Sequence, residues 1–312
     1  MTSATAPPTR LPAKGPVVRR GPVTARGRLS GYLFVSPACL LFLVFIGGPF
    51  LYAAGLSLFS WDLLTPPRFA GLGNFAQLAG DHEARRAILN TFIFAFASVV
   101  SHISVGLALA LAVNRKMNTV VKYVVRTSFF FPFLISWAAV ALLWKYVLDP
   151  SFGIANYYLH LVHLPTSNWL ASPSLALPSL IVVDFWHTIG YTFIILLAGL
   201  QTVPAQLNEA AMVDGAGPWQ RFWHVTLPVM SPTVFFATVI TFIGAFQIFE
   251  PMLIMTAGGP NGATESIVQD IYSQGFQSFK VGYASALALV VFAVIMGVTL
   301  LQFRLSRYWV HQ

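Results

Sequence analysis

The sequence predicts an all-α integral membrane protein with six transmembrane helices, and three observations support this fold class. Hydrophobic residues make up 56% of the 312 residues and charged residues only 9%, with a mean hydropathy of +0.71, whereas about a quarter of the residues in a soluble globular protein are charged. The apolar residues form runs of about 20 or more, the length a helix needs to cross a bilayer core of about 30 Å. These runs do not alternate at period two, which favours helices over a β-barrel.

The six expected spans follow one another with short connections, near residues 31–58, 88–113, 122–147, 174–201, 229–250 and 283–303. Residues 1–28 form a tail rich in Pro and Arg, which we expect to be disordered. The apolar run behind this tail is too long for a signal peptide, so we expect an uncleaved first helix. Residues 29–312 are therefore predicted to be one six-helix transmembrane domain.

The distribution of basic residues predicts the orientation. Thirteen of the 18 Lys and Arg residues fall in segments that six spans place on one side: the tail, two connections and the end of the chain. By the positive-inside rule, both termini and the 203–228 segment are cytoplasmic. The net charge of +8 then reflects topology and attraction to anionic membrane lipid. No basic, aromatic-interleaved domain is present, so we expect no nucleic-acid partner.

The segment EAAMVDGAGPWQRFWHVTLP, residues 209–228, connects the fourth and fifth spans. Pro204 suits the first turn of a short helix, and Gly215 permits a left-handed turn at its end. Pro218 can start a second short helix through Val225 that stops before Leu227-Pro228. Such a rigid, partly apolar bend is suited to docking on another protein or to lying on lipid, and the physics alone leaves both readings open.

The spacing of residues in this segment resembles a known family. Glu209-Ala210-Ala211, Gly215, Val225 and Leu227-Pro228 follow the pattern of the EAA loop in permeases of binding-protein-dependent ABC importers, with Val225 where the family usually has Ile. Further motifs resemble the carbohydrate-uptake branch: Gly73-Asn74-Phe75, Asn90-Thr91, Trp186, Ala198-Gly199-Leu200-Gln201, Asp214-Gly215-Ala216 and Met255-Thr256-Ala257-Gly258-Gly259-Pro260. The resemblance runs from about residue 31 to the end of the chain.

The resemblance implies a type I ABC importer permease fold in which the 203–228 segment is a cytoplasmic coupling helix. The residues it assigns to ATPase coupling are Glu209, Ala210, Ala211, Asp214, Gly215, Ala216, Leu227 and Pro228. It implies a second permease subunit, an ATPase dimer and an extracytoplasmic solute-binding protein as partners. ATP and Mg would be bound by the ATPase, so we expect no cofactor in this chain.

The Gly258-Gly259-Pro260 stretch is similar to the larger permease half of maltose-type importers. This chain differs from that half in having six spans and a short first outer connection, so it is closer to the glycerol-3-phosphate and multiple-sugar permeases. The implied function is ATP-driven import of a sugar or sugar-like solute of the oligosaccharide, glycerol-3-phosphate or glycerophosphodiester class. The implied location is the bacterial inner membrane.

Polar groups inside spans are costly and indicate function or pairing. Asp184 and His187 lie three residues apart on one face of the fourth span, and they either satisfy each other, bond a neighbouring helix or face the solute. The resemblance places solute contacts at Trp186, His187, Thr188 and Tyr191, and in the fifth span at Thr241, Gly244, Ala245 and Ile248, with Gln247 beside them. For Gly244 and Ala245, helix packing is favoured over solute contact.

The sequence lacks motifs for chemistry within the chain. It has no G-x-x-x-x-G-K-[ST] phosphate loop, no HExxH or cysteine cluster for a metal, and no G-x-S-x-G nucleophile. We therefore expect a non-catalytic transport subunit. The alternative is a self-sufficient secondary transporter, but the two halves show no sequence symmetry and the spans hold no chain of acids for coupling ions.

Overall fold

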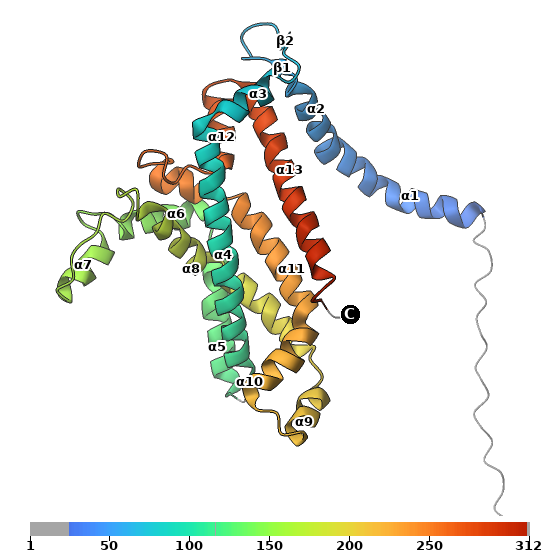
Figure 1. Cartoon of the computed structure of the whole chain (residues 1–312), viewed down its shortest axis with the longest axis vertical. Helices are drawn as coiled ribbons and strands as arrows, with labels where there is room; N and C mark the ends of the chain where they lie inside the picture. Colours follow the sequence, from blue (N-terminus) through green and yellow to red (C-terminus); the bar gives the residue numbers. More distant parts are fainter. Residues whose placement is uncertain (1–24, 116, 311–312) are drawn as a thin grey trace, which may run out of the picture. The chain divides into compact units, whose positions relative to one another are not determined.

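The computed structural model describes residues 25–115 and 117–310 (Figure 1). The chain divides into two compact units, Met1–Tyr52 and Ala53–Gln312. In the first unit, α1 (Ala25–Phe42) continues through a π-helical turn at Leu43–Gly47 into α2 (Gly48–Leu56), whose end belongs to the second unit. These helices cover the first expected span. The helix already includes residues 25–28, which the sequence assigns to the tail, and residues 1–24 lie outside the described residues.

The second unit begins with a small folded segment at one end of its helices. The two-residue strands β1 (Phe59–Ser60) and β2 (Arg68–Phe69) pair antiparallel, and α3 (Gly73–Gly80) follows. The Asn74 side chain donates hydrogen bonds to the carbonyls of Ser57 and Phe59, at 2.7 and 2.9 Å. These bonds fix the strand pair to α3.

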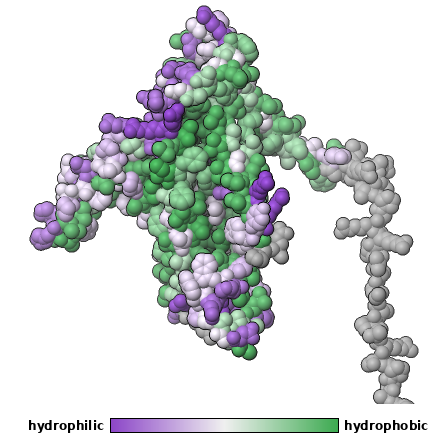
Figure 2. Space-filling view, in the orientation of Figure 1, coloured by the Kyte–Doolittle hydropathy of each residue, from purple (hydrophilic) through white to green (hydrophobic). Residues whose placement is uncertain are grey.

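The remaining helices of the second unit alternate between long spans and short connecting helices. They are α4 (His82–Asn114), α5 (Thr119–Phe130), α6 (Trp137–Val147), α7 (Ile154–Leu161), α8 (Ala176–Gln201), α9 (Ala205–Val213), α10 (Pro218–Arg221), α11 (Leu227–Phe246), α12 (Ile267–Tyr272) and α13 (Val281–Ser306). Within the described residues, five helices are long and apolar enough to span a membrane, and a bent pair makes a sixth crossing if it counts as one. Figure 2 shows apolar residues over much of the second unit, with hydrophilic residues gathered at its top and bottom and on the arm that carries α7.

The third expected span, near 122–147, is not one straight helix. α5 runs into a 3₁₀ turn at Phe131–Leu134, and α6 leaves at 98° to it. Pro132 lies in that turn, where it cannot donate a backbone hydrogen bond, and the Ser136 hydroxyl caps the new helix by accepting from the amide of Ala139 at 3.4 Å. The break places Phe133 and Trp137 on either side of a corner beside α8.

The expectation that the short helix stops before Leu227-Pro228 is wrong. The chain is helical without interruption from Pro218 to Phe246, because a π-helical turn at Phe222–Thr226 links α10 to α11. In this turn the amide of Leu227 bonds the carbonyl of Phe222, five residues back. The π turn and the proline lie next to each other at the start of α11, and both are features that bend a helix without ending it.

The core of the second unit forms where α4, α8 and α11 pack on one another. α8 also lies against α5 at Gly190, where a Cβ would overlap the backbone carbonyl of Phe129. Glycine is therefore required at position 190 for the two helices to approach this closely. This packing holds the middle of α8 at a fixed distance from its neighbours.

Candidate functional site

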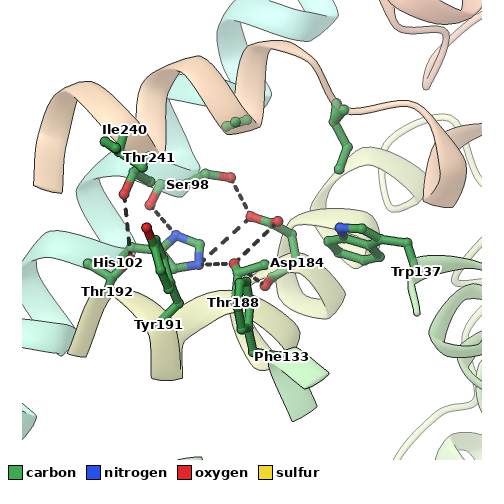
Figure 3. A pocket seen from close by; sticks show the side chains of 13 residues that line it. Ser98, His102, Phe133, Trp137, Asp184, Thr188, Tyr191, Thr192, Ile240 and Thr241 are labelled. Atoms are coloured by element: carbon green, nitrogen blue, oxygen red, sulfur yellow. Dashed lines mark hydrogen bonds and ion pairs between the residues drawn. The ribbon is translucent and has the colours of Figure 1, made fainter. Parts of the chain in front are cut away.

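A cavity of about 220 Å³ lies among α4, α8, α11 and the corner between α5 and α6 (Figure 3). We call it the central cavity. Its lining combines hydroxyl-bearing, aromatic and small apolar side chains with one carboxylate and one imidazole. The lining residues are Ser98, His102, Phe133, Trp137, Asp184, Thr188, Tyr191, Thr192, Ile240, Thr241, Gly244, Ala245 and Ile248.

Asp184 and His102 form the polar side of this cavity, where α4 meets α8. Oδ2 of Asp184 accepts a hydrogen bond from the Ser98 hydroxyl at 2.7 Å and lies 3.9 Å from Nε2 of His102. The other ring nitrogen of His102 lies against the Ser98 carbonyl, so it must carry a hydrogen. Nε2 of His102 is 2.6 Å from the Thr188 hydroxyl. The network is thus closed within the chain, as expected for buried polar groups in a span.

Aromatic rings form another side of the cavity. Phe133 stacks on Tyr191 with ring centroids 4.9 Å apart. Trp137 lies 4.0 Å from the ring of His187, whose Nε2 is 3.0 Å from the carbonyl of Ile135. Phe133 lies in the 3₁₀ turn and Trp137 begins α6, so both rings reach the cavity from the corner between α5 and α6.

The structure brings together most of the residues expected along the solute pathway. Those that line the central cavity are Asp184, Thr188, Tyr191, Thr241, Gly244, Ala245 and Ile248. Three others lie elsewhere: Trp186 packs edge-on against Trp144 at 5.5 Å, His187 lies behind Trp137, and Gln247 lines a different groove with residues of α12 and α13. Asp184 does not hydrogen-bond His187 but accepts from the neighbouring helix α4, which was one of the open alternatives.

Sequence reasoning missed the contribution of α4 to the cavity. Ser98 and His102 are almost fully buried, at 1% exposure each, and their spacing of four residues puts them on one helical face. A serine and a histidine at this spacing inside an apolar run could have been recognised as costly groups that need an explanation. Within the described residues, no three His, Cys, Asp or Glu side chains are placed to hold a metal ion.

The 203–228 segment differs sharply from the cavity, since α9 contains no buried residue. Gly215 has φ of +81°, which confirms the predicted left-handed turn, and the amide of Ala216 bonds the carbonyl of Ala211 to close the helix end. Val213 is 88% exposed and Trp219 72% exposed. The segment is thus a bend that leaves part of its apolar surface exposed, while Val203 and Leu227 at its two ends pack against the core.

Three comparisons with known proteins agree with one another. The family model described as "Binding-protein-dependent transport system inner membrane component" matches residues 102–309. The probable ABC transporter permease protein YurN of Bacillus subtilis is 36% identical, over 89% of this chain and 96% of the relative. The trehalose/maltose transport system permease protein MalF of Thermococcus litoralis is 30% identical, over 89% and 94%.

The likeness extends to a solved structure, a bacterial ABC transporter involved in the import of the acidic polysaccharide alginate. The TM-score is 0.79 at 26% identity, with 91% of this chain and 96% of the solved chain covered. That transporter has also been solved with an alginate pentasaccharide-bound periplasmic protein. The predicted permease fold is confirmed, and a secondary transporter is excluded.

The match covers most of the chain and joins the sequence motifs to the observed fold. The chain belongs to the family of binding-protein-dependent transport system inner membrane components, as a permease subunit of an ABC importer and not as an enzyme.

Proposed function

We propose that this chain, with a second permease subunit, imports a sugar or sugar-like solute through the central cavity, driven by ATP hydrolysis in a separate ATPase dimer that docks on the 203–228 segment. An extracytoplasmic binding protein delivers the solute. The observation that carries the proposal is the pairing of an uncovered, rigid helix α9 with a small polar and aromatic cavity in the same chain.

The geometry of the 203–228 segment supports docking on a protein. An exposed valine, an exposed methionine (Met212) and a rigid turn at Gly215 present apolar area without a flexible backbone. Apolar area of this kind, rimmed by polar residues such as Glu209 and Asp214, is typical of protein interaction sites. The side chains of Ala210, Ala211 and Ala216 are small, so the backbone of a partner can approach the segment closely.

The competing reading is that α9 and α10 lie on lipid. The ring contacts among Trp219, Phe222 and Trp223 suit a membrane interface, where tryptophan is enriched. The two readings can hold together, with the aromatic cluster at the lipid surface and α9 in the partner. The docking and lipid readings can be distinguished by measuring which side chains a partner protein shields from chemical labelling.

The experiment is reconstitution of this chain with its second permease, ATPase and binding protein in liposomes. We expect solute uptake to require all partners and ATP, and the single purified chain to hydrolyse no ATP. In a Cys39→Ser background, Val213→Cys should be shielded from a water-soluble thiol reagent only when the ATPase is present. Uptake by the single chain, or equal labelling of Val213→Cys with and without the ATPase, would contradict the proposal.

The orientation is tested in the same background. We propose that both termini and the 203–228 segment face the cytoplasm, as the basic residues predict. In right-side-out vesicles, Gln220→Cys should then be accessible to a thiol reagent only from the vesicle interior, which is the cytoplasmic side. Asn261→Cys should be accessible only from the exterior. Labelling of both positions from one side would overturn this topology.

A further inference from the structure

We infer that the central cavity selects an uncharged, hydroxylated solute unit and disfavours anionic ones, with Asp184 and His102 as the groups that set this preference. The inference deepens the proposed transport function and rests on it. It concerns the charge of the solute, which the family alone leaves open, and it assigns a role to the α4 residues that no sequence motif identifies.

The charge inventory of the cavity is the first step. Among the described residues that line it, none is Lys or Arg, and the one carboxylate is that of Asp184. Phosphate and carboxylate ligands are generally recognised by Arg, Lys or a helix N-terminus. Here the cavity borders the middles of α4 and α8 and the C-terminal end of α11, where the helix carbonyls disfavour an anion. Trp137 begins α6, and at that N-terminus the Ser136 hydroxyl already accepts from the amide of Ala139.

His102 cannot take the place of a lysine or arginine in binding an anion. One ring nitrogen lies against the Ser98 carbonyl, and the other is 2.6 Å from the Thr188 hydroxyl. The side chain is 1% exposed, so neither nitrogen is left for a solute. When the ring is neutral the Asp184–His102 pair carries one negative charge, and when the ring is protonated the pair is neutral. The polar wall therefore offers an anion no net attraction.

The rest of the lining suits a sugar ring. The hydroxyls of Thr192 and Thr241 are 3.5 Å apart, a weak contact that a solute hydroxyl can replace with better geometry. Phe133, Trp137 and Tyr191 provide aromatic faces that pack against apolar C–H surfaces. Pockets with such apolar walls and a few convergent polar groups are typical of small-ligand sites.

A purely structural role for the pair is the alternative, because Ser98, His102, Asp184 and Thr188 also connect α4 to α8. The two roles make different predictions. A structural clamp affects the amount of folded protein and the uptake of every solute alike. A selective group changes the ratio between neutral and anionic solutes.

The experiment measures ATP-dependent uptake by the complete transporter, with its own binding protein, of matched radiolabelled probes: neutral mono- to trisaccharides and the same sugars carrying a uronate carboxylate or a phosphate. We expect neutral sugars to be taken up at least about tenfold faster than their anionic counterparts, since burying a second anion beside Asp184 is unfavourable. Asp184→Asn should reduce this ratio at least about threefold, because the variant removes the charge that disfavours the anion. The binding protein is the same in both measurements, so a change in the ratio comes from the permease.

The control variant is Asp149→Asn, which makes the same change of charge outside the cavity. Asp149 accepts from the amides of Ser151 and Phe152 at 2.8 and 3.2 Å, and an asparagine oxygen can keep these bonds, so the ratio should not move. Should Asp184→Asn fold poorly, Tyr191→Phe keeps the ring and removes one hydroxyl, and should slow uptake of the neutral sugar several-fold.

The outcomes separate the two proposals. Preferential uptake of anionic sugars by the unaltered transporter, or an unchanged ratio in Asp184→Asn with equal loss for all probes, would overturn the selectivity. An unchanged rate in Tyr191→Phe would likewise count against solute contact in this cavity. Uptake of neither kind of sugar would contradict the proposed function itself.

Discussion

The central cavity and the 203–228 segment are built in opposite ways. In the cavity wall, the Asp184 carboxylate accepts from Ser98 on α4, the His102 ring contacts Thr188 on α8, and Gly190 lies against the backbone of α5. In the 203–228 segment α9 buries no residue, and nothing lies within 4 Å of a Cβ built on Gly215. The geometry of the cavity is thus fixed by contacts within the chain, whereas α9 is left exposed, and in the proposed function the ATPase covers it.

This difference teaches where the effects of substitutions should be seen. Changes in the cavity wall act first on the stability of this chain, because they disturb packing that is already complete. Changes in the 203–228 segment leave the chain folded and act on the complex. The two glycines at positions 190 and 215 make the comparison testable, since both are required but for different physical reasons.

Gly190→Ala should have the largest effect. The added methyl group would overlap the carbonyl of Phe129, a backbone atom that cannot turn away, and overpacking of this kind typically costs about 1–3 kcal/mol or more. We expect most of the folded protein to be lost, measured by size-exclusion chromatography and thermal unfolding in detergent.

Gly297→Ala is the matched control for this effect. It lies in α13 with nothing within 4 Å of the new Cβ, and alanine is the better helix former by about 1 kcal/mol, so the yield should be unchanged. If Gly190→Ala folds as well as Gly297→Ala, the close crossing of α5 and α8 is not essential, and the contrast between the two regions fails.

Gly215→Val should come next, and it should act on the complex alone. Its φ of +81° is unfavourable for a residue with a Cβ by roughly 1–2 kcal/mol, which corresponds to a population change of about 5- to 30-fold. Since the position is open, we expect normal yield and unfolding temperature but a loss of solute-stimulated ATP hydrolysis of that order.

Gly217→Ala serves as the control in the same segment. Its φ is −67° and its new Cβ would lie 3.8 Å from the nearest atom, on Gln220, so hydrolysis should stay near normal. Normal coupling in Gly215→Val would remove the argument that this turn positions a docking helix.

The sequence predicted the exposed segment better than the cavity, and the reason is physical. Pro204, Gly215 and Pro218 act locally, through the conformations that each residue allows, so the bend can be read from a few neighbours. The helical continuity through Pro228 was missed because it depends on a π turn at Phe222–Thr226, which no local preference specifies. The fold class followed from hydrophobicity, which is summed over long runs.

The cavity depends on contacts between distant parts of the chain. Thr188, Tyr191 and Thr241 were identified from motifs in the fourth and fifth spans, but the partners of Asp184 on α4 are 82 to 86 residues earlier and carry no motif. The corner that presents Phe133 and Trp137 arises from the 98° bend between α5 and α6. Hydropathy indicates that a segment crosses the membrane and says nothing of such an angle.

Val213→Ser should have a smaller effect than Gly215→Val and again act only on the complex. Val213 is 88% exposed, and burying a valine in a partner is worth about 1.5 kcal/mol or more. We expect unchanged stability of the chain and a several-fold weaker retention of the ATPase, measured by co-purification of the reconstituted complex. Gln206→Ser, on the same exposed helix, is the control, and equal retention in both variants would move the contact away from Val213.

The end of the second unit that carries α3 lies between the two extremes, because it is hydrogen-bonded within its own chain yet close to water. The hydroxyl of Tyr283 donates to Asp81 at 2.6 Å, and the amides of Glu83 and Ala84 donate to the other carboxylate oxygen. Burial alone would raise the pKa of Asp81, but these bonds and the charge of Lys280 lower it overall. Tyr283→Phe removes one of the bonds and should have the smallest effect, a loss of about 1 kcal/mol.

The pH dependence of this last variant follows from the direction of the shift. A carboxylate whose pKa is lower in the folded state stabilises the fold above its ordinary value of 3.8 and loses this contribution as the pH falls through the folded value. The difference in unfolding temperature between the unaltered protein and Tyr283→Phe should therefore be full at pH 7 and at pH 5, and should shrink below about pH 4. Tyr272→Phe, whose ring stacks on Phe276 at 5.6 Å, controls for loss of a hydroxyl near the same end. A difference that persists unchanged at low pH would mean that Tyr283 stabilises this region by packing and not through the charge of Asp81, which would group it with the cavity wall.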